Sequence, residues 1–185
     1  MKTTLIFRSF VICLIVLALM PVASSSAAPP SRNLAPNPSF EKARKKVVTG
    51  WSGNVSNVTF TWSKGIAYSG KHSVCISNLP AQSSGDWVTS EFIPVTPGTT
   101  YTFSAYGKGD FDQEAYILVF PIDADGNYLV GSATDISFNN TDWTYAEVVL
   151  TVPADAVAVE LDLGTNNTSD TATTGMICYD DVSFR

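Results

Sequence analysis

The chain has 185 residues, of which 17 are acidic and 11 are basic, so its formal net charge is −6. An acidic surface has no electrostatic attraction for the phosphates of nucleic acid or for an anionic membrane, and we expect neither as a partner. The length is sufficient for one domain with a sizeable hydrophobic core.

The first residues have the pattern of a secretory signal peptide. Basic residues precede an unbroken apolar run from Phe10 to Met20, and small residues follow, with cleavage expected after Ser25 or Ala27. The run is too short to span a bilayer comfortably, which favours a cleaved signal over a membrane anchor. We therefore predict a signal peptide over residues 1–27, a single domain over 28–185, and a secreted or cell-surface protein.

After this segment, short β-rich runs alternate with turns that are rich in Gly, Pro, Asn and Asp. The runs are KHSVCISN (71–78), DWVTSEFIPV (86–95), TYTFSAYGKG (100–109), EAYILVFPI (114–122), WTYAEVVLTV (143–152), AVAVELDLG (156–164) and GMICYDDVSF (175–184). Period-two alternation turns Tyr106 away from the apolar face of its run, and Glu160 and Asp162 away from theirs. Regularly spaced strands joined by turns predict an all-β fold, either an antiparallel β-sandwich or a barrel.

Catalytic motifs are not recognisable in the sequence. His72 is the only histidine, it lies where a predicted strand begins, and no G-x-S-x-G pattern accompanies it. A zinc site would need a cluster of ligands that one His and two separated Cys do not supply. Acidic residues are numerous, but no pattern among them indicates a glycosidase pair. We predict that the protein is not an enzyme.

Two cysteines, Cys75 and Cys178, remain once the signal peptide is removed. An even number of cysteines in an exported protein favours a disulfide. The alternative is two buried thiols that act as small apolar residues.

Several stretches, taken together and in order, resemble a known family. They are NLAPNPSFEKARKKVVTGWS, YSGKHSVCIS, VTPGTTYTFSAYGKG, DADGN, WTYAEVVLTVPADAVAVELDL and CYDDVSFR. They are similar to the cellulose- and xylan-type carbohydrate-binding modules, which have a galactose-binding-like jelly roll. The resemblance extends from residue 33 to residue 185 and implies a non-catalytic β-sandwich that binds a polysaccharide or glycan. A glycoside hydrolase is then expected only as a separate partner protein.

The resemblance also implies a structural calcium and a disulfide. In such modules the first and last strands lie together, and calcium often binds between them; carried over, the ligands are Glu41 and Asp180 or Asp181. A hard cation would neutralise adjacent carboxylates that otherwise repel each other. The alternative is that the two aspartates point to opposite faces, one solvated and one bonded to backbone N–H groups. The same topology places the strands of the two cysteines side by side.

Sugar recognition needs exposed aromatic rings with hydrogen-bonding groups beside them. Trp51 and Trp143 match family positions that are usually in the core, so we assign them to packing. The predicted carbohydrate-binding residues lie outside that pattern or face away from the core: Trp62, Trp87, Tyr106, Tyr116 and Glu160. Tyr116 lies in a run that is apolar on both faces, which a buried second face or a protein partner would also explain. The alternative function is a cell-surface structural or adhesion domain of the same fold without sugar binding.

Overall fold

The computed structural model describes residues 32–109, 114–130, 134–138, 141–173 and 175–185, with backbone only for 134–138. The predicted signal peptide lies outside these residues. The strands, in chain order, are β1 (Ala43–Arg44), β2 (Val47–Val48), β3 (Trp51–Gly53), β4 (Thr59–Lys64), β5 (His72–Ser77), β6 (Ser83–Thr89), β7 (Ile93–Pro94), β8 (Thr100–Gly109), β9 (Glu114–Asp123), β10 (Thr134–Phe138), β11 (Thr144–Thr151), β12 (Ala156–Asn167) and β13 (Met176–Phe184). No helix within the described ranges is long and apolar enough to cross a membrane.

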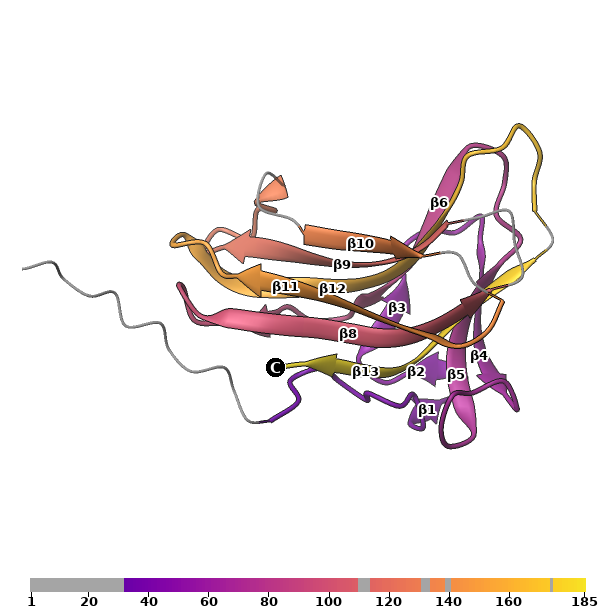
Figure 1. The fold of residues 1–185 in the computed structure, drawn as a ribbon, viewed down its shortest axis with the longest axis horizontal. Helices are drawn as coiled ribbons and strands as arrows, with labels where there is room; N and C mark the ends of the chain where they lie inside the picture. The colour runs from indigo at the N-terminus through magenta and orange to yellow at the C-terminus, as the bar shows by residue number, and fades with distance from the viewer. Residues whose placement is uncertain (1–31, 110–113, 131–133, 139–140, 174) are drawn as a thin grey trace, which may run out of the picture.

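Two antiparallel sheets form a β-sandwich, which confirms the predicted fold class. One has the order β10-β9-β12-β6-β3, with β7 beside β12, and is called here the β12 sheet. The other has the order β11-β8-β13-β5-β4 and is called the β8 sheet. In Figure 1 the strands β9 and β12 lie above β8 and β13. Most neighbouring strands are distant in sequence, so the fold depends on long-range pairing.

The core lies between the sheets because each long strand directs alternate apolar side chains inward. On β12, Val159, Leu161 and Leu163 are fully buried, and on β9 the same holds for Ile117 and Val119. Aromatic rings fill the remaining space, and the largest fully buried ones are Trp51, Tyr179, Phe40, Phe103 and Phe184. The assignment of Trp51 to the core is therefore confirmed.

The segment before β1 lies beside the last strand, as the family resemblance implied. The Leu34 N–H donates to the Phe184 carbonyl at 2.8 Å. The Asn33 side chain binds the same strand twice, by donating to the Val182 carbonyl and by accepting from the Phe184 N–H, both at 2.9 Å. The two ends of the domain are thus hydrogen-bonded to each other.

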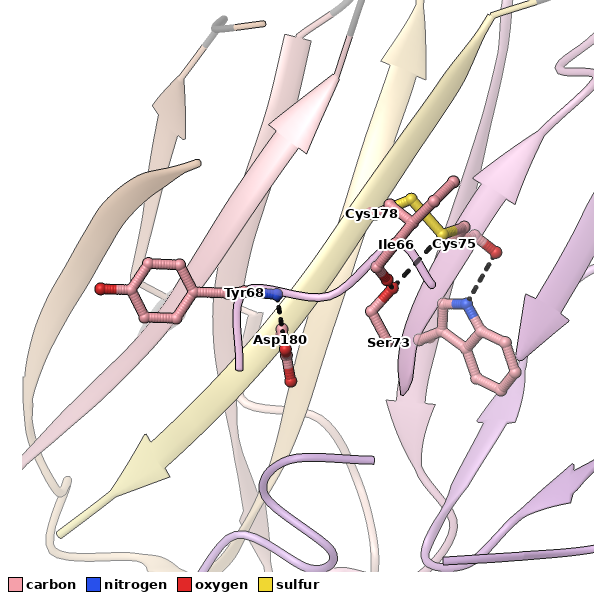
Figure 2. Close-up of a disulfide and its surroundings, with 7 residues drawn as sticks. Ile66, Tyr68, Ser73, Cys75, Cys178 and Asp180 are labelled. Carbon is pink, nitrogen blue, oxygen red and sulfur yellow. Dashed lines mark hydrogen bonds between the residues drawn. A yellow bond between two sulfur atoms is a disulfide. The ribbon is translucent and has the colours of Figure 1, made fainter. Parts of the chain in front are cut away.

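Cys75 on β5 and Cys178 on β13 lie directly opposite each other and form a disulfide. The structure therefore has the bridge that the resemblance implied. The bond lies close to the loop that joins β4 to β5: the Ser73 hydroxyl oxygen is 3.6 Å from the Cys75 sulfur, and this hydroxyl donates to the Ile66 carbonyl of the loop (Figure 2). Because the bridged residues are 103 positions apart, the bond links two distant parts of the chain.

Two of the tryptophan assignments are wrong. Trp87 is only 5% exposed; it lies in the core, and its indole N–H donates to the Cys75 carbonyl at 3.1 Å. It pairs with the inward-facing Leu163, so its side chain points between the sheets, where it cannot stack on a sugar. Trp143, assigned to packing, is instead half-buried just before β11, with its ring 6.1 Å from that of Tyr68.

Candidate functional site

Acidic and aromatic side chains gather on the outer face of the β12 sheet. The alternation that buries Leu161 and Leu163 turns Glu160 and Asp162 outward. Asp162 pairs with Val88 on β6 and with Leu118 on β9, so the acids stand in the middle of the sheet.

Gly164 allows a side-chain bridge across this face. It lies between Asp86 on β6 and Tyr116 on β9 in the register of the sheet. A Cβ atom at residue 164 would collide with both of those side chains. Because glycine has no Cβ, the Tyr116 hydroxyl can donate to the Asp86 carboxylate directly above the backbone.

The Asp86 carboxylate also has a partner on the opposite side. The Asn54 amide donates to it, and Asn54 is held in turn by the Asp86 backbone N–H, which donates to the Asn54 side-chain oxygen at 3.0 Å. Burial of the Asp86 carboxyl raises its pKa, and the hydrogen bonds from Tyr116 and Asn54 oppose that rise. The hydrogen bonds therefore hold these three side chains together and give both oxygens of the Asp86 carboxylate a partner.

Beside it is a hollow of about 500 Å³, which we call the acidic hollow. Its lining residues are Asn54, Asp86, Val88, Phe120, Tyr128, Val130, Glu160 and Asp162. Three of these are carboxylic acids, and none of the described lining residues is basic. The hollow thus combines hydrogen-bond acceptors with two aromatic rings.

Tyr128 reaches the acidic hollow because of the turn that follows β9. The Asp123 carboxylate accepts from the backbone N–H groups of Asp125 (2.9 Å) and Asn127 (2.8 Å), and Gly126 has a φ of 85°. The turn brings the chain back along β9, where Tyr128 bridges to Ile122.

The Tyr128 ring is 45% exposed, and its hydroxyl donates to the Glu160 carboxylate at 2.9 Å. It meets the Phe120 ring edge-on, with the ring centroids 5.7 Å apart. Tyr128 is therefore an exposed aromatic ring that contacts one acid and two neighbouring rings, because the Phe92 ring also meets it edge-on with the centroids 6.1 Å apart.

Asp162 is the least satisfied acid of the acidic hollow. It is 5% exposed, and its Oδ1 atom has no hydrogen-bond partner among the residues that the structure describes. Burial, and then the charges of Glu160 and Asp86, raise the pKa of the Asp162 carboxyl to about 8. A buried polar atom without a partner costs on the order of 1–3 kcal/mol, which a bound ligand with a hydroxyl donor could recover.

A larger hollow of about 640 Å³ lies beside β7, lined by residues that include Leu34, Pro36, Phe92 and Pro94. Its charged lining residues are Arg32 and Glu91, and no group of acids converges on it. Size alone does not make a binding site, so we assign the site to the acidic hollow, where acceptors and aromatic rings converge.

The predicted sugar-binding residues fall in four different places. Tyr116 and Glu160 lie together on the outer face of the β12 sheet. Tyr106 points outward from the β8 sheet and therefore lies on the opposite side of the sandwich from Glu160. Trp62 is half-buried on β4, and Trp87 is in the core.

One face of the Trp62 ring is covered by a neighbouring side chain. Its ring stacks on that of His72 with centroids 4.0 Å apart, and its N–H donates to the Phe40 carbonyl at 2.7 Å. The position anchors the N-terminal segment to β4.

Sequence reasoning missed Asp86 and Tyr128. No sequence pattern pointed to Asp86, because its role depends on a hydrogen bond from Tyr116, which lies on another strand. Tyr128 had a weak signal: an aromatic residue directly after an Asp-Gly turn is placed back against the strand it has just left. The two-sided apolar run of β9 also has an explanation, because its outward Phe120 lines the acidic hollow.

The three predicted metal ligands gather around the loop between β4 and β5. The Glu41 carboxylate accepts from the N–H groups of Lys71 (2.6 Å) and His72 (2.9 Å), and its other oxygen lies 2.9 Å from the His72 ring nitrogen. These contacts, the His72 side chain first, lower the pKa of the Glu41 carboxyl to about 2. Asp180 accepts from the N–H groups of Tyr68 (2.8 Å) and of residue 69.

The carboxylates are thus already bonded to N–H groups, as in the alternative considered for the aspartates. No group of three or more His, Cys, Asp or Glu side chains with metal-binding geometry is found among the described residues. Burial raises the pKa of the Asp180 carboxyl to about 6. Calcium at this loop stays a prediction.

A sequence model of a carbohydrate-binding domain family matches residues 32–171. The chain belongs to this carbohydrate-binding family. The match spans all strands up to β12 and includes every residue of the acidic hollow. No curated protein sequence gives a match.

Solved structures similar to this carbohydrate-binding domain agree with the fold. A family 16 carbohydrate-binding module has a TM-score of 0.57 at 24% identity, covering 83% of this chain and 99% of that one. A family 22 xylan-binding domain from Paenibacillus barcinonensis has a TM-score of 0.56 at 15% identity, with coverages of 80% and 90%.

The enzymatically active domain of a tailspike protein from bacteriophage CBA120 has a TM-score of 0.64 at 16% identity. The alignment covers 82% of this chain but only 21% of the tailspike chain. At these identities the likeness concerns the fold, and the activity of the tailspike does not transfer with it.

Proposed function

We propose that this domain binds a polysaccharide or glycan non-covalently in the acidic hollow and performs no catalysis itself. Membership of a carbohydrate-binding family supports the ligand class. The choice of the acidic hollow as the binding site rests on one observation: the buried Oδ1 atom of Asp162, which has no partner among the described residues, lies in the same hollow as the exposed Tyr128 ring. A sugar offers hydroxyl donors to such an oxygen and a C–H face to such a ring.

In this proposal each residue has a distinct task. Asp162 and Glu160 accept hydrogen bonds from sugar hydroxyls, and Tyr128 and Phe120 supply apolar contact. Tyr116 acts indirectly, because its hydroxyl is committed to Asp86 and holds that side chain in place.

We further propose that the protein is secreted or held at the cell surface, and that any glycoside hydrolase acts with it as a separate protein. The predicted signal peptide and the disulfide between Cys75 and Cys178 support export, because disulfides persist in oxidising compartments.

Affinity electrophoresis against soluble β-glucans, xylans, mannans and galactans tests the proposal. Xylan is the first probe, because a family 22 neighbour is a xylan-binding domain. Tyr128→Ala should weaken retention at least about tenfold, a loss of about 1.4 kcal/mol, with an unchanged melting temperature. Val157→Ala, at an exposed position of the same strand as Glu160, is the matched control.

Binding to a neutral polysaccharide should also persist at high salt, because there is no ligand charge to screen. If the unmodified protein binds no member of the panel, the structural or adhesion function replaces the proposal. Release of reducing sugar would instead show that the protein is a hydrolase and would overturn the proposal of a non-catalytic domain.

A further inference from the structure

Four aromatic side chains form a second group on the outer face of the β8 sheet, which we call the tyrosine surface: Tyr68, Tyr106, Trp143 and Tyr145. Tyr106 on β8 and Tyr145 on β11 are directly opposite each other, with ring centroids 5.4 Å apart. Tyr68 comes from the loop between β4 and β5 and stacks on Tyr106 at 3.6 Å, with the ring planes 10° apart. The sheet thus brings together rings that are distant in sequence.

The position of Tyr68 is fixed by the two adjacent aspartates of the last strand. The Asp180 carboxylate accepts from the backbone N–H groups of Tyr68 (2.8 Å) and Ser69 (3.0 Å), and the Ser69 hydroxyl donates to Asp181 at 2.7 Å. Figure 2 shows the Tyr68 N–H pointing at Asp180 while the ring extends away from it. A ring that is already held in place loses little entropy when a ligand stacks on it.

The tyrosine surface is open to solvent although its rings pack against one another. Tyr68 is 45% exposed and Tyr145 is 49% exposed, while Tyr106 covers one face of the Tyr68 ring. Polar groups border the rings: the Tyr145 hydroxyl donates to Glu147 at 2.8 Å, and the Lys108 ammonium lies 5.9 Å from the centre of the Trp143 ring. A contiguous group of exposed aromatic side chains of this kind is typical of a binding surface.

We propose that the tyrosine surface is a second carbohydrate-binding site, on the opposite face of the sandwich from the acidic hollow. Exposed ring faces bordered by an acid and an ammonium group match the C–H faces and the hydroxyls of a pyranose chain. A second copy of this chain is a poorer occupant, because each copy has a net charge of −6 and the copies repel. With two sites on opposite faces, one molecule can bridge two polysaccharide chains.

The first test uses a protein whose acidic hollow has been disabled by Tyr128→Ala and Glu160→Gln. In affinity electrophoresis against the same soluble polysaccharides, this variant should keep part of its retention. Adding Tyr68→Ala and Tyr145→Ala should then lower retention at least about tenfold. The matched control is Val149→Ala, since Val149 is 53% exposed on the outward face of β11 but carries no ring. Melting curves establish that each variant is folded.

The second test measures bridging. The unmodified protein should raise the turbidity of a soluble polysaccharide solution, and disabling either site alone should abolish that increase while single-site retention persists. Tyr68→Trp should restore bridging that Tyr68→Ala removes, because it restores a stacking ring.

The outcomes separate this proposal from the proposed function. If the unmodified protein is retained but the variant with the disabled hollow is not, the second site is wrong and the hollow stands. If only the Tyr68→Ala and Tyr145→Ala changes abolish retention, the tyrosine surface is the sugar site and the hollow is not. Absence of retention by the unmodified protein overturns both. A concentration-dependent dimer, formed without polysaccharide and abolished by the tyrosine substitutions, would assign this surface to self-association.

Discussion

Replacing Asp162 by Asn should change how the stability of the protein depends on pH. The Asp162 carboxyl is almost fully buried, its Oδ1 has no partner among the described residues, and its pKa is raised from 3.8 to about 8. The folded state therefore holds this proton more tightly than the unfolded state does. The resulting stabilisation is fully present below about pH 4 and is lost as the pH rises toward 8.

The size of the change in stability follows from the rise in the pKa of Asp162. Between pH 5 and pH 7 the residue stays mostly protonated in the folded state and is ionised in the unfolded state. The free energy of unfolding of the unmodified protein should then fall by about 1.4 kcal/mol per pH unit through this group alone, or about 2.7 kcal/mol over the interval. The Asp162→Asn variant has no such proton to lose, so its stability should fall less over the same interval.

Urea unfolding at pH 5, 6 and 7, at constant ionic strength, measures this difference. Comparing the two proteins removes contributions that both share, such as that of Asp180, whose pKa is raised to about 6. Glu41, with a pKa lowered to about 2, acts below this interval. If the two free energies of unfolding stay parallel from pH 5 to pH 7, Asp162 is ionised in the folded state and the argument for an unpartnered buried acid is wrong.

Three further predictions concern stability. Replacing both Cys75 and Cys178 by Ala removes a bond that closes a loop between residues 103 positions apart. In the chain-entropy model the free energy of unfolding should fall by about 4.7 kcal/mol. Urea unfolding measures this change, and a loss below about 1 kcal/mol would contradict the model. Trp87→Ala should lower the free energy of unfolding by roughly 3–5 kcal/mol because the ring is in the core. An unchanged melting curve would show that the ring is not part of the core. If calcium binds between Glu41 and Asp180, a chelator should lower the melting temperature, calcium should restore it, and Glu41→Ala should remove the response; identical curves with and without chelator would end the calcium hypothesis.

The sequence by itself was enough to predict the fold class and, along the long strands β8 and β12, which side chains face away from the core. Alternation along β8 and β12 correctly turned Tyr106, Glu160 and Asp162 outward, because the two-residue period of a strand is a local property. Turn residues marked the strand ends for a similar reason, as at Gly126, whose φ of 85° glycine adopts without strain. The pairing of Cys75 with Cys178 was implied by family resemblance, since strand order is not a local property.

Only the tertiary structure decided which outward residues share a face. Alternation defines a side chain's direction relative to its own sheet, and it does not say to which of two sheets the strand belongs. Tyr106 and Glu160 therefore looked alike in sequence although the sandwich places them on opposite sides. The bridge from Tyr116 to Asp86 over Gly164, like the stacking of Tyr68 on Tyr106, joins residues from separate strands or loops. Such contacts depend on strand order and register, which arise only when the whole chain packs together.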